Sequence, residues 1–233
     1  VLYPRTLPAL ELRDGVPASL RTMVVVPTLL TSRPGVDEQI ERLEVLHLAS
    51  RDGDLHFGLL TDWTDSATET SSGDDDLFNA AVDGIARLNQ RYGATSDGPR
   101  FFLLHRRRLW NEGQGMWIGW ERKRGKLHEL NRWLRGATDT TFVPIGGALP
   151  VPPSAVRYVI TLDADTRLPP GAAKRLVGKM AHPLNRPRLD PRTGRVVQGY
   201  AVLQPRVTPS LPRSQNASLF QRVFTSPSGL DPY

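Results

Sequence analysis

Two aspartates one residue apart, Asp163 and Asp165, follow an apolar run in "YVITLDADT". Carboxylates with this spacing can both reach one hard divalent cation if the backbone bends between them, and Mg²⁺ or Mn²⁺ accepts such ligands while keeping waters and substrate phosphates. The pair therefore predicts a catalytic Mg²⁺ or Mn²⁺ site with both aspartates as metal ligands. The chain has no cysteine, so oxygen or imidazole must supply any ligand.

Three kinds of site share a pair of acids with this spacing. A calcium-binding EF-hand loop requires an acid or amide and then glycine where this chain has Arg167 and Leu168. A phosphatase of the haloacid dehalogenase type requires threonine or valine at Arg167, yet a phosphoryl-transfer enzyme with Asp163 as nucleophile stays open as an alternative. The third kind, the metal motif of GT-A glycosyltransferases, requires an apolar strand, the acid pair and a helix soon afterwards, and "YVITLDADTRLPPGAAKRL" supplies all three.

The elements that must position the acids follow from hydrophobic periodicity. Apolar residues recur at strand or helix spacing in alternating segments, and Pro27 is expected to end the first strand because proline cannot donate to a central ladder. The pattern predicts strands at 22–26, 54–65, 101–104, 156–162 and 196–203, and helices at 35–50, 74–92, 124–136 and 170–181. This alternation is typical of an α/β fold with an open, mainly parallel, Rossmann-like sheet flanked by helices.

Polar residues cluster where these strands end. Ligands of open parallel sheets bind outside the carboxyl ends of the strands. The candidates there are Pro27 and Thr28, Asp62 with the weaker Asp65, the pair Asp163 and Asp165, and Gln204 with Arg206. We expect the acids from separate strands to converge on one site.

The net charge of +6 is unevenly distributed. Thirteen acids face two bases between Asp37 and Asp83, whereas ten lysines or arginines face three glutamates between Arg100 and Arg135. Such a basic block can meet phosphate in a nucleotide, a lipid head group or nucleic acid. A nucleic-acid-binding module using this block is a further alternative, but no RNP1 motif or C₂H₂ finger supports it, so we expect no nucleic-acid partner. No apolar run is long enough to span a bilayer.

Longer stretches carry a more specific resemblance. The segments "RDGDLHFGLLTDWTDS", "WIGWERKRGKLHELNRWLRGATDTTF", "VRYVITLDADTRLP" and "MAHPLNRPRLDPRTGRVVQGY" are similar to the glycosyltransferase region of cyclic β-1,2-glucan synthases. The resemblance covers 21–233, after an N-terminal extension at 1–20. It implies a GT-A domain that is incomplete at the C-terminus and transfers glucose from UDP-glucose to a growing β-1,2-glucan, with a metal and with inversion. It further implies a larger synthase embedded in the bacterial inner membrane, with the catalytic face in the cytoplasm.

The resemblance also implies roles for individual residues. The general base is expected beyond Tyr233, so the chain need not be active alone. Aromatic faces suit sugar rings, and four tryptophans lie within twenty-four positions: Trp110, Trp117, Trp120 and Trp133. We expect most of them in the core and one or two, Trp120 among them, to contact the acceptor glucan. The implied nucleotide-sugar-binding residues are Pro27, Thr28, Asp62, Arg124, Lys126 and Asp163, and the implied acceptor-binding residues are Gln204 and Arg206.

Overall fold

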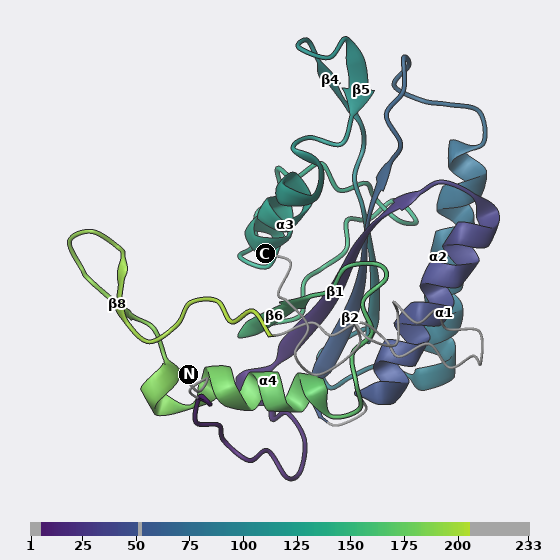
Figure 1. Cartoon of the computed structure of the whole chain (residues 1–233). Helices are drawn as coiled ribbons and strands as arrows, with labels where there is room; N and C mark the ends of the chain where they lie inside the picture. The colour runs from purple at the N-terminus through teal and green to yellow at the C-terminus, as the bar shows by residue number, and fades with distance from the viewer. Residues whose placement is uncertain (1–5, 51–52, 206–233) are drawn as a thin grey trace, which may run out of the picture. The chain divides into compact units, whose positions relative to one another are not determined.

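A computed structural model describes residues 6–50 and 53–205 of the chain (Figure 1). The chain divides after Pro183 into two units, which are described separately. The first unit contains η1 (Ala18–Leu20), β1 (Thr22–Leu30), α1 (Arg33–Ala49), β2 (Leu55–Trp63), α2 (Asp74–Tyr92), β3 (Phe101–His105), β4 (Leu109–Asn111), β5 (Met116–Ile118), α3 (Arg122–Trp133), β6 (Tyr158–Thr161) and α4 (Ala172–Ala181).

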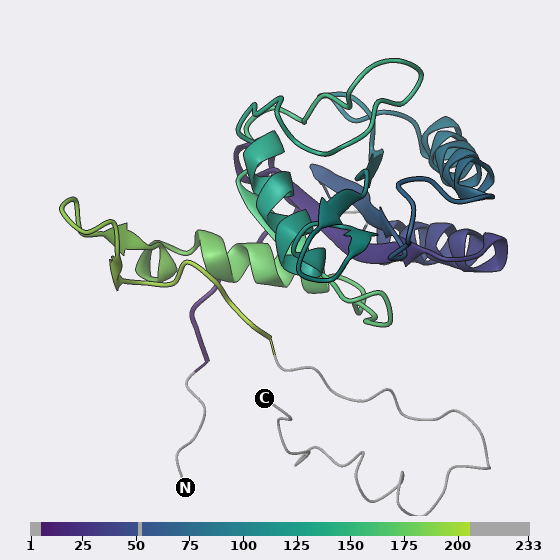
Figure 2. The same ribbon diagram turned by 90° about the horizontal axis from the view of Figure 1, so that it is seen from above.

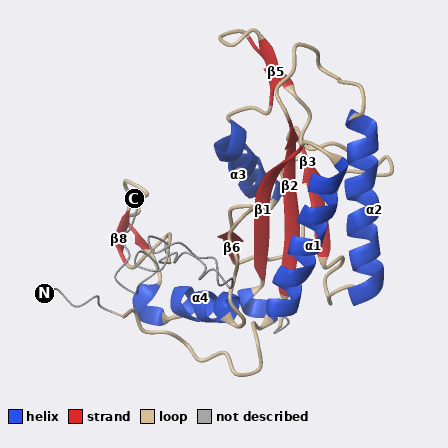
Figure 3. Ribbon diagram, turned by 45° about the vertical axis from the view of Figure 1, so that its right-hand side comes forward, coloured by secondary structure: helices blue, strands red, loops and turns tan. Residues whose placement is uncertain are grey.

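Four parallel strands form the central sheet in the order β3-β2-β1-β6. Thr22 at the start of β1 lies opposite Leu55 of β2 and Tyr158 of β6, so the carboxyl ends of these strands share one edge. The predicted α/β class, with a mainly parallel Rossmann-like sheet flanked by helices, is confirmed and is consistent with a GT-A fold. Figure 3 shows the strands between the helices.

Alternate side chains of β1 build two hydrophobic layers, as the period of two in a strand requires. Val24 and Val26 belong to a core with the apolar faces of α1, α2 and α4, whereas Met23 and Val25 pack with Leu130 and other residues of α3. Figure 2 shows α3 on one side of the sheet and α1 and α2 on the other. The sheet is therefore covered on both faces and presents its carboxyl edge to ligands.

The prediction that Pro27 ends the first strand is wrong. β1 continues to Leu30, and Pro27 lies opposite Leu60 of β2. The carbonyl of Val25 accepts a hydrogen bond from Leu162 N, so the backbone groups of Val25, and two residues later those of Pro27, point toward β6. Because β6 ends at Thr161, the missing N–H of Pro27 costs no ladder hydrogen bond.

The strand before the aspartate pair is shorter and less buried than predicted. β6 covers only Tyr158–Thr161 and is the edge strand of the described sheet. Its side chains alternate between partly buried and exposed, and Val159 is 37% exposed. The apolar run therefore reflects one covered face of an edge strand, not burial on both sides.

The second unit does not supply the predicted fifth strand of the sheet. Among its described residues, β8 (Val196–Gln198) pairs antiparallel with β7 (Arg188–Leu189) in a two-stranded hairpin. Asp190 N donates to Arg195 O and Gly194 N donates to Asp190 O, which closes the turn locally. The apolar residues at 196–203 thus form a short hairpin strand, and Gln204 does not follow a strand of the parallel sheet.

Residues ahead of β1 pack against the rest of the first unit. Val16 is buried in the larger core, its carbonyl accepts a hydrogen bond from Asp54 N, and Leu10 N donates to Gly178 O in α4. The boundary expected at residue 21 stays a prediction. In the part of the chain that the structure describes, no helix is both long and apolar enough to cross a membrane.

Candidate functional site

A buried charge cluster lies at the carboxyl ends of β2 and β3. Asp62, the penultimate residue of β2, is 2% exposed, and Arg106 directly follows β3. The Arg106 guanidinium donates from Nε to Asp62 Oδ1 at 2.7 Å and from Nη2 to Asp62 Oδ2 at 2.9 Å. Its Nη1 donates to Glu129 Oε1 at 3.1 Å. Both Asp62 oxygens are thus engaged inside the protein, and its predicted contact with a nucleoside remains untested.

Arg106 also donates hydrogen bonds to two backbone carbonyls at the N-terminal end of α3. Its Nη1 donates to Trp120 O at 3.0 Å and its Nη2 donates to Arg122 O at 3.1 Å. Glu121 and Arg122 have φ values of 50° and 47°, so the chain turns through the left-handed region there. A Cβ on Gly125 would lie 1.9 Å from Trp120 O, which only glycine avoids. These contacts fix where α3 begins.

Two lysines on successive turns of α3 connect three strand ends. Lys126 is buried, donates a hydrogen bond to Thr28 O in β1, and lies 3.3 Å from Asp62 Oδ2 in β2. Burial lowers the pKa of Lys126, and the charge of Asp62 offsets part of this effect. Lys123, three residues earlier and so on the same helix face, forms an ion pair with Asp163 after β6. One face of α3 thus links Asp62 and Asp163 indirectly, and their predicted convergence on one ligand site stays a prediction.

The aspartate pair lies on a turn fixed by backbone contacts. Leu162 N donates to Val25 O at 3.0 Å, Thr166 N donates to Asp163 O at 2.9 Å, and Arg42 of α1 donates to Ala164 O. Both carboxylates are exposed, and the Asp163 side chain is 62% accessible. No described residue forms a hydrogen bond or ion pair with the Asp165 side chain. The turn thus presents one carboxylate paired with Lys123 and one that is available for a ligand.

The donor chemistry of this turn fits a hard divalent cation. The two exposed carboxylates offer oxygen ligands of the kind that Mg²⁺ and Mn²⁺ prefer. Among residues 6–50 and 53–205, no cluster of three or more histidine, cysteine, aspartate or glutamate side chains could hold a metal by itself. A cation held by Asp163 and Asp165 would therefore need waters or substrate phosphates to complete its ligand set.

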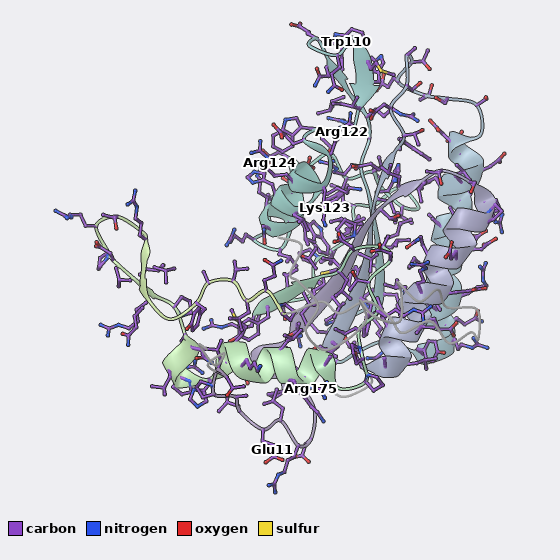
Figure 4. All side chains as sticks on the ribbon, in the orientation of Figure 1. Glu11, Trp110, Arg122, Lys123, Arg124 and Arg175 are labelled. Atoms are coloured by element: carbon purple, nitrogen blue, oxygen red, sulfur yellow. The ribbon has the colours of Figure 1, made fainter. Side chains whose placement is uncertain are left out.

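The remaining residues that the sequence predicts for the site differ in exposure and in location. Pro27 is buried, Thr28 is partly exposed, and Trp120 is 43% exposed beside the entrance to α3. Arg124 is 79% exposed and pairs with Glu121. Figure 4 shows Lys123 on the side of α3 that faces β1 and Arg124 on the far side. Gln204 is exposed in the second unit, and Arg206 lies outside the described residues.

The sequence interpretation missed Lys123 and Arg106. It selected Arg124 and Lys126 from "KRGKLHELN", but the helix begins at Arg122, which directs Lys123 and Lys126 to the sheet. The spacing of three between the lysines was the available signal. Nothing in the run "HRRR" distinguishes Arg106, which is fully buried, from Arg107, which is exposed.

A cavity of about 380 Å³ opens between the N-termini of α1 and α2. Its lining carries the hydroxyls of Thr31, Ser32 and Thr64 together with Arg108, whose guanidinium is paired with Asp74 at 2.6 Å. Neither Asp163 nor Lys123 lines this cavity. The aspartate turn is an exposed part of the edge, and a ligand there would bind on open surface.

No family model matches the chain. The chain is 54% identical over 230 residues to "Cyclic beta-(1,2)-glucan synthase NdvB" of Rhizobium meliloti (strain 1021). This chain is similar to one segment of a cyclic β-(1,2)-glucan synthase. The match covers 99% of the chain and 8% of the rhizobial synthase, so it includes the site and confirms the resemblance inferred from the motifs.

His105 at the end of β3 gives the site region a pH-dependent stability. Its Nδ1 lies 2.7 Å from Thr61 Oγ1, its Nε2 has no partner among the described residues, and its ring packs on Trp63. Burial, with a smaller contribution from the charge of Lys126, lowers the pKa of His105 to about 3. His105 is therefore neutral in the native state throughout the neutral and mildly acidic range.

We expect stability to fall as pH decreases from 7 to 5. The unfolded chain protonates His105 near its ordinary pKa of about 6.5, whereas the native chain does not, so the free energy of unfolding should drop by about 2 kcal/mol from this residue. His56, whose pKa burial also lowers, acts in the same direction. Urea unfolding at both pH values should show a smaller loss for His105→Gln than for the unchanged chain. Equal pH dependence of the two proteins would contradict this assignment.

Proposed function

We propose that the chain is the donor-binding part of a glycosyltransferase that transfers glucose from UDP-glucose to a growing β-1,2-glucan. The observation that carries the proposal is that Lys126 and Lys123, on one face of α3, pair with Asp62 of β2 and with Asp163 after β6. The 54% identity to a protein named as a cyclic β-(1,2)-glucan synthase supports the reaction class and the product.

Departure of the diphosphate requires positive charge where negative charge develops. Lys123 is half exposed beside Asp163 and supplies one such charge from the protein. Asp163 and Asp165 would hold Mg²⁺ or Mn²⁺, which when bound offsets further diphosphate charge. Asp62, Arg106 and Lys126 are buried inside the protein, and they act by holding the N-terminal end of α3 in place. Pro27 and Thr28 would line the nucleoside site, with Arg124 contributing only long-range charge.

An inverting transfer also needs a carboxylate that deprotonates the acceptor hydroxyl. We place this base in another segment of the larger synthase, and we propose that Trp120 faces the acceptor. The acceptor roles expected for Gln204 and Arg206 stay predictions, and Arg206 lies outside the described residues. The larger synthase would act at the cytoplasmic face of the bacterial inner membrane. On this proposal the chain binds donor and metal but requires the rest of the synthase for turnover.

Three of the ten lysines and arginines in the basic block cannot contribute to a nucleic-acid surface. Arg106, Arg108 and Lys126 are buried and paired within the protein, so their charges are not available to an extended phosphate backbone. The other seven are partly or fully exposed, so the nucleic-acid-binding module stays an alternative that a titration with RNA would test.

A thermal-shift screen tests the proposal directly. UDP with Mn²⁺, at about tenfold above its dissociation constant, should stabilise the native state by about 1.4 kcal/mol and raise the melting temperature by about 3–6 °C. GDP or ADP with Mn²⁺, and UDP with EDTA, should raise it much less. Equal shifts with all three nucleotides, or a UDP shift that survives EDTA, would contradict the proposed donor site.

A further inference from the structure

The hairpin of β4 and β5 presents a pair of tryptophans. Trp110 and Trp117 lie directly opposite each other, with ring centroids 5.9 Å apart at 62°. The backbone N–H and C=O of Trp117 both bond to Ser66, on the side away from β4. The two tryptophans therefore form a non-hydrogen-bonded pair, in which cross-strand side chains lie closest.

These rings are not part of either hydrophobic core. Trp110 is 50% exposed and Trp117 is partly exposed, and no described residue accepts a hydrogen bond from either indole N–H. Trp133 provides the contrast, because it is 4% exposed and its indole donates to Pro150 O at 2.7 Å. The two part-exposed rings, whose indole N–H groups have no acceptor among the described residues, can therefore offer an apolar face and hydrogen-bond donors to a ligand.

The hairpin is tied to the proposed transfer site. Arg122, the first residue of α3, donates from Nη2 to Gln114 in the hairpin turn at 3.3 Å and to Asp65 at 2.7 Å. The next residue, Lys123, forms the ion pair with Asp163. Figure 1 shows the hairpin beyond the N-terminal end of α3, and Figure 4 places Trp110 on it, with Arg122 between the hairpin and Lys123.

We infer that Trp110 and Trp117 form a subsite for the glucan chain, an inference that rests on the proposed function. Aromatic faces bury the C–H surface of a glucose ring and leave its hydroxyls to polar partners. The side-chain amide nitrogens of Asn111 and Gln114 have no acceptor among the described residues and lie on the same hairpin. Glu112 is the only charged residue from 109 to 118, so the surface suits a neutral, hydroxyl-rich ligand.

Titration of the 233-residue chain with linear β-1,2-glucooligosaccharides, followed by calorimetry and tryptophan fluorescence, tests the subsite. Trp110→Ala should weaken binding by about tenfold, whereas Trp110→Phe keeps a ring and should stay within about threefold of the unchanged chain. Glu112→Ala, in the exposed turn of the same hairpin, is the matched control and should bind normally. Trp110→Thr, which favours a strand, provides a second variant if the alanine variant melts early.

The outcomes separate the subsite from the proposed function. Equal oligosaccharide affinity in the unchanged chain and Trp110→Thr, or no binding by the unchanged chain, overturns the subsite. If UDP and Mn²⁺ still bind in that case, the donor-site proposal stands by itself. If the unchanged chain does not bind UDP, the proposed function on which the subsite rests is wrong.

Discussion

Replacing Asp165 by asparagine is expected to weaken Mn²⁺-dependent binding of UDP-glucose by at least about tenfold while leaving the melting temperature of the free chain unchanged. Asp165 is exposed and has no hydrogen-bond or ion-pair partner among the described residues, so the native state loses no contact. The substitution keeps the size of the side chain but removes the charge on which a hard cation depends. Calorimetric titration should show affinity at least about tenfold weaker, equivalent to about 1.4 kcal/mol.

A matched control for this variant is Asp139→Asn. Asp139 is also an exposed aspartate, but its carboxylate pairs with Arg132 at 2.5 Å, near the C-terminal end of α3. Its substitution should leave UDP-glucose binding intact. If Asp165→Asn bound UDP-glucose and Mn²⁺ as tightly as the control, the assignment of the metal to the aspartate pair would be wrong.

Replacing Arg106 by leucine should cause the largest loss of stability. The substitution leaves Asp62 and Glu129 buried without their shared cation, and removal of one partner from a buried ion pair costs about 3–5 kcal/mol. Two carbonyls at the entrance to α3 also lose their donor. We expect the melting temperature to fall by roughly 6–20 °C for a chain of this size, measured together with urea unfolding.

Arg107→Leu is the control, because Arg107 is the exposed neighbour and should change stability by less than about 0.5 kcal/mol. The double variant Asp62→Leu with Arg106→Leu should recover part of the loss, since it removes an unpaired buried carboxylate. Comparable losses for Arg106→Leu and Arg107→Leu would show that the buried network does not hold this region together.

The order of strands and helices could be predicted because each has a clear period. Leu43 and Leu46 repeat at helical spacing, and "VVV" in β1 reads as a strand covered on both faces. Strand limits were harder, because they depend on neighbours far away in sequence. Whether Pro27 ends β1 depends on where β6 stops, and whether 196–203 joins the sheet depends on a partner, which here is the short strand β7.

The site could be predicted in outline from strand ends, but not in its ion pairs. The sequence marks Asp62 and Asp163 as acids that follow apolar runs. The sequence does not show that Asp62 forms a buried ion pair with Arg106, because the two residues lie at the ends of different strands, β2 and β3. Likewise, the choice among Lys123, Arg124 and Lys126 depends on the helical phase of α3, which the left-handed residues Glu121 and Arg122 set.

The outer side of β6 has a consequence for how the isolated chain behaves. Because Leu162 N and the backbone of Tyr158 point toward β1, the alternation of the strand directs the N–H and C=O groups of Val159 and Thr161 outward. No residue of 6–50 or 53–205 forms a backbone hydrogen bond with these outward groups, and an exposed strand edge of this kind is a template to which another strand can add. Purified on its own, the chain should self-associate at high concentration through this rim, and a lysine at Val159 should keep it monomeric.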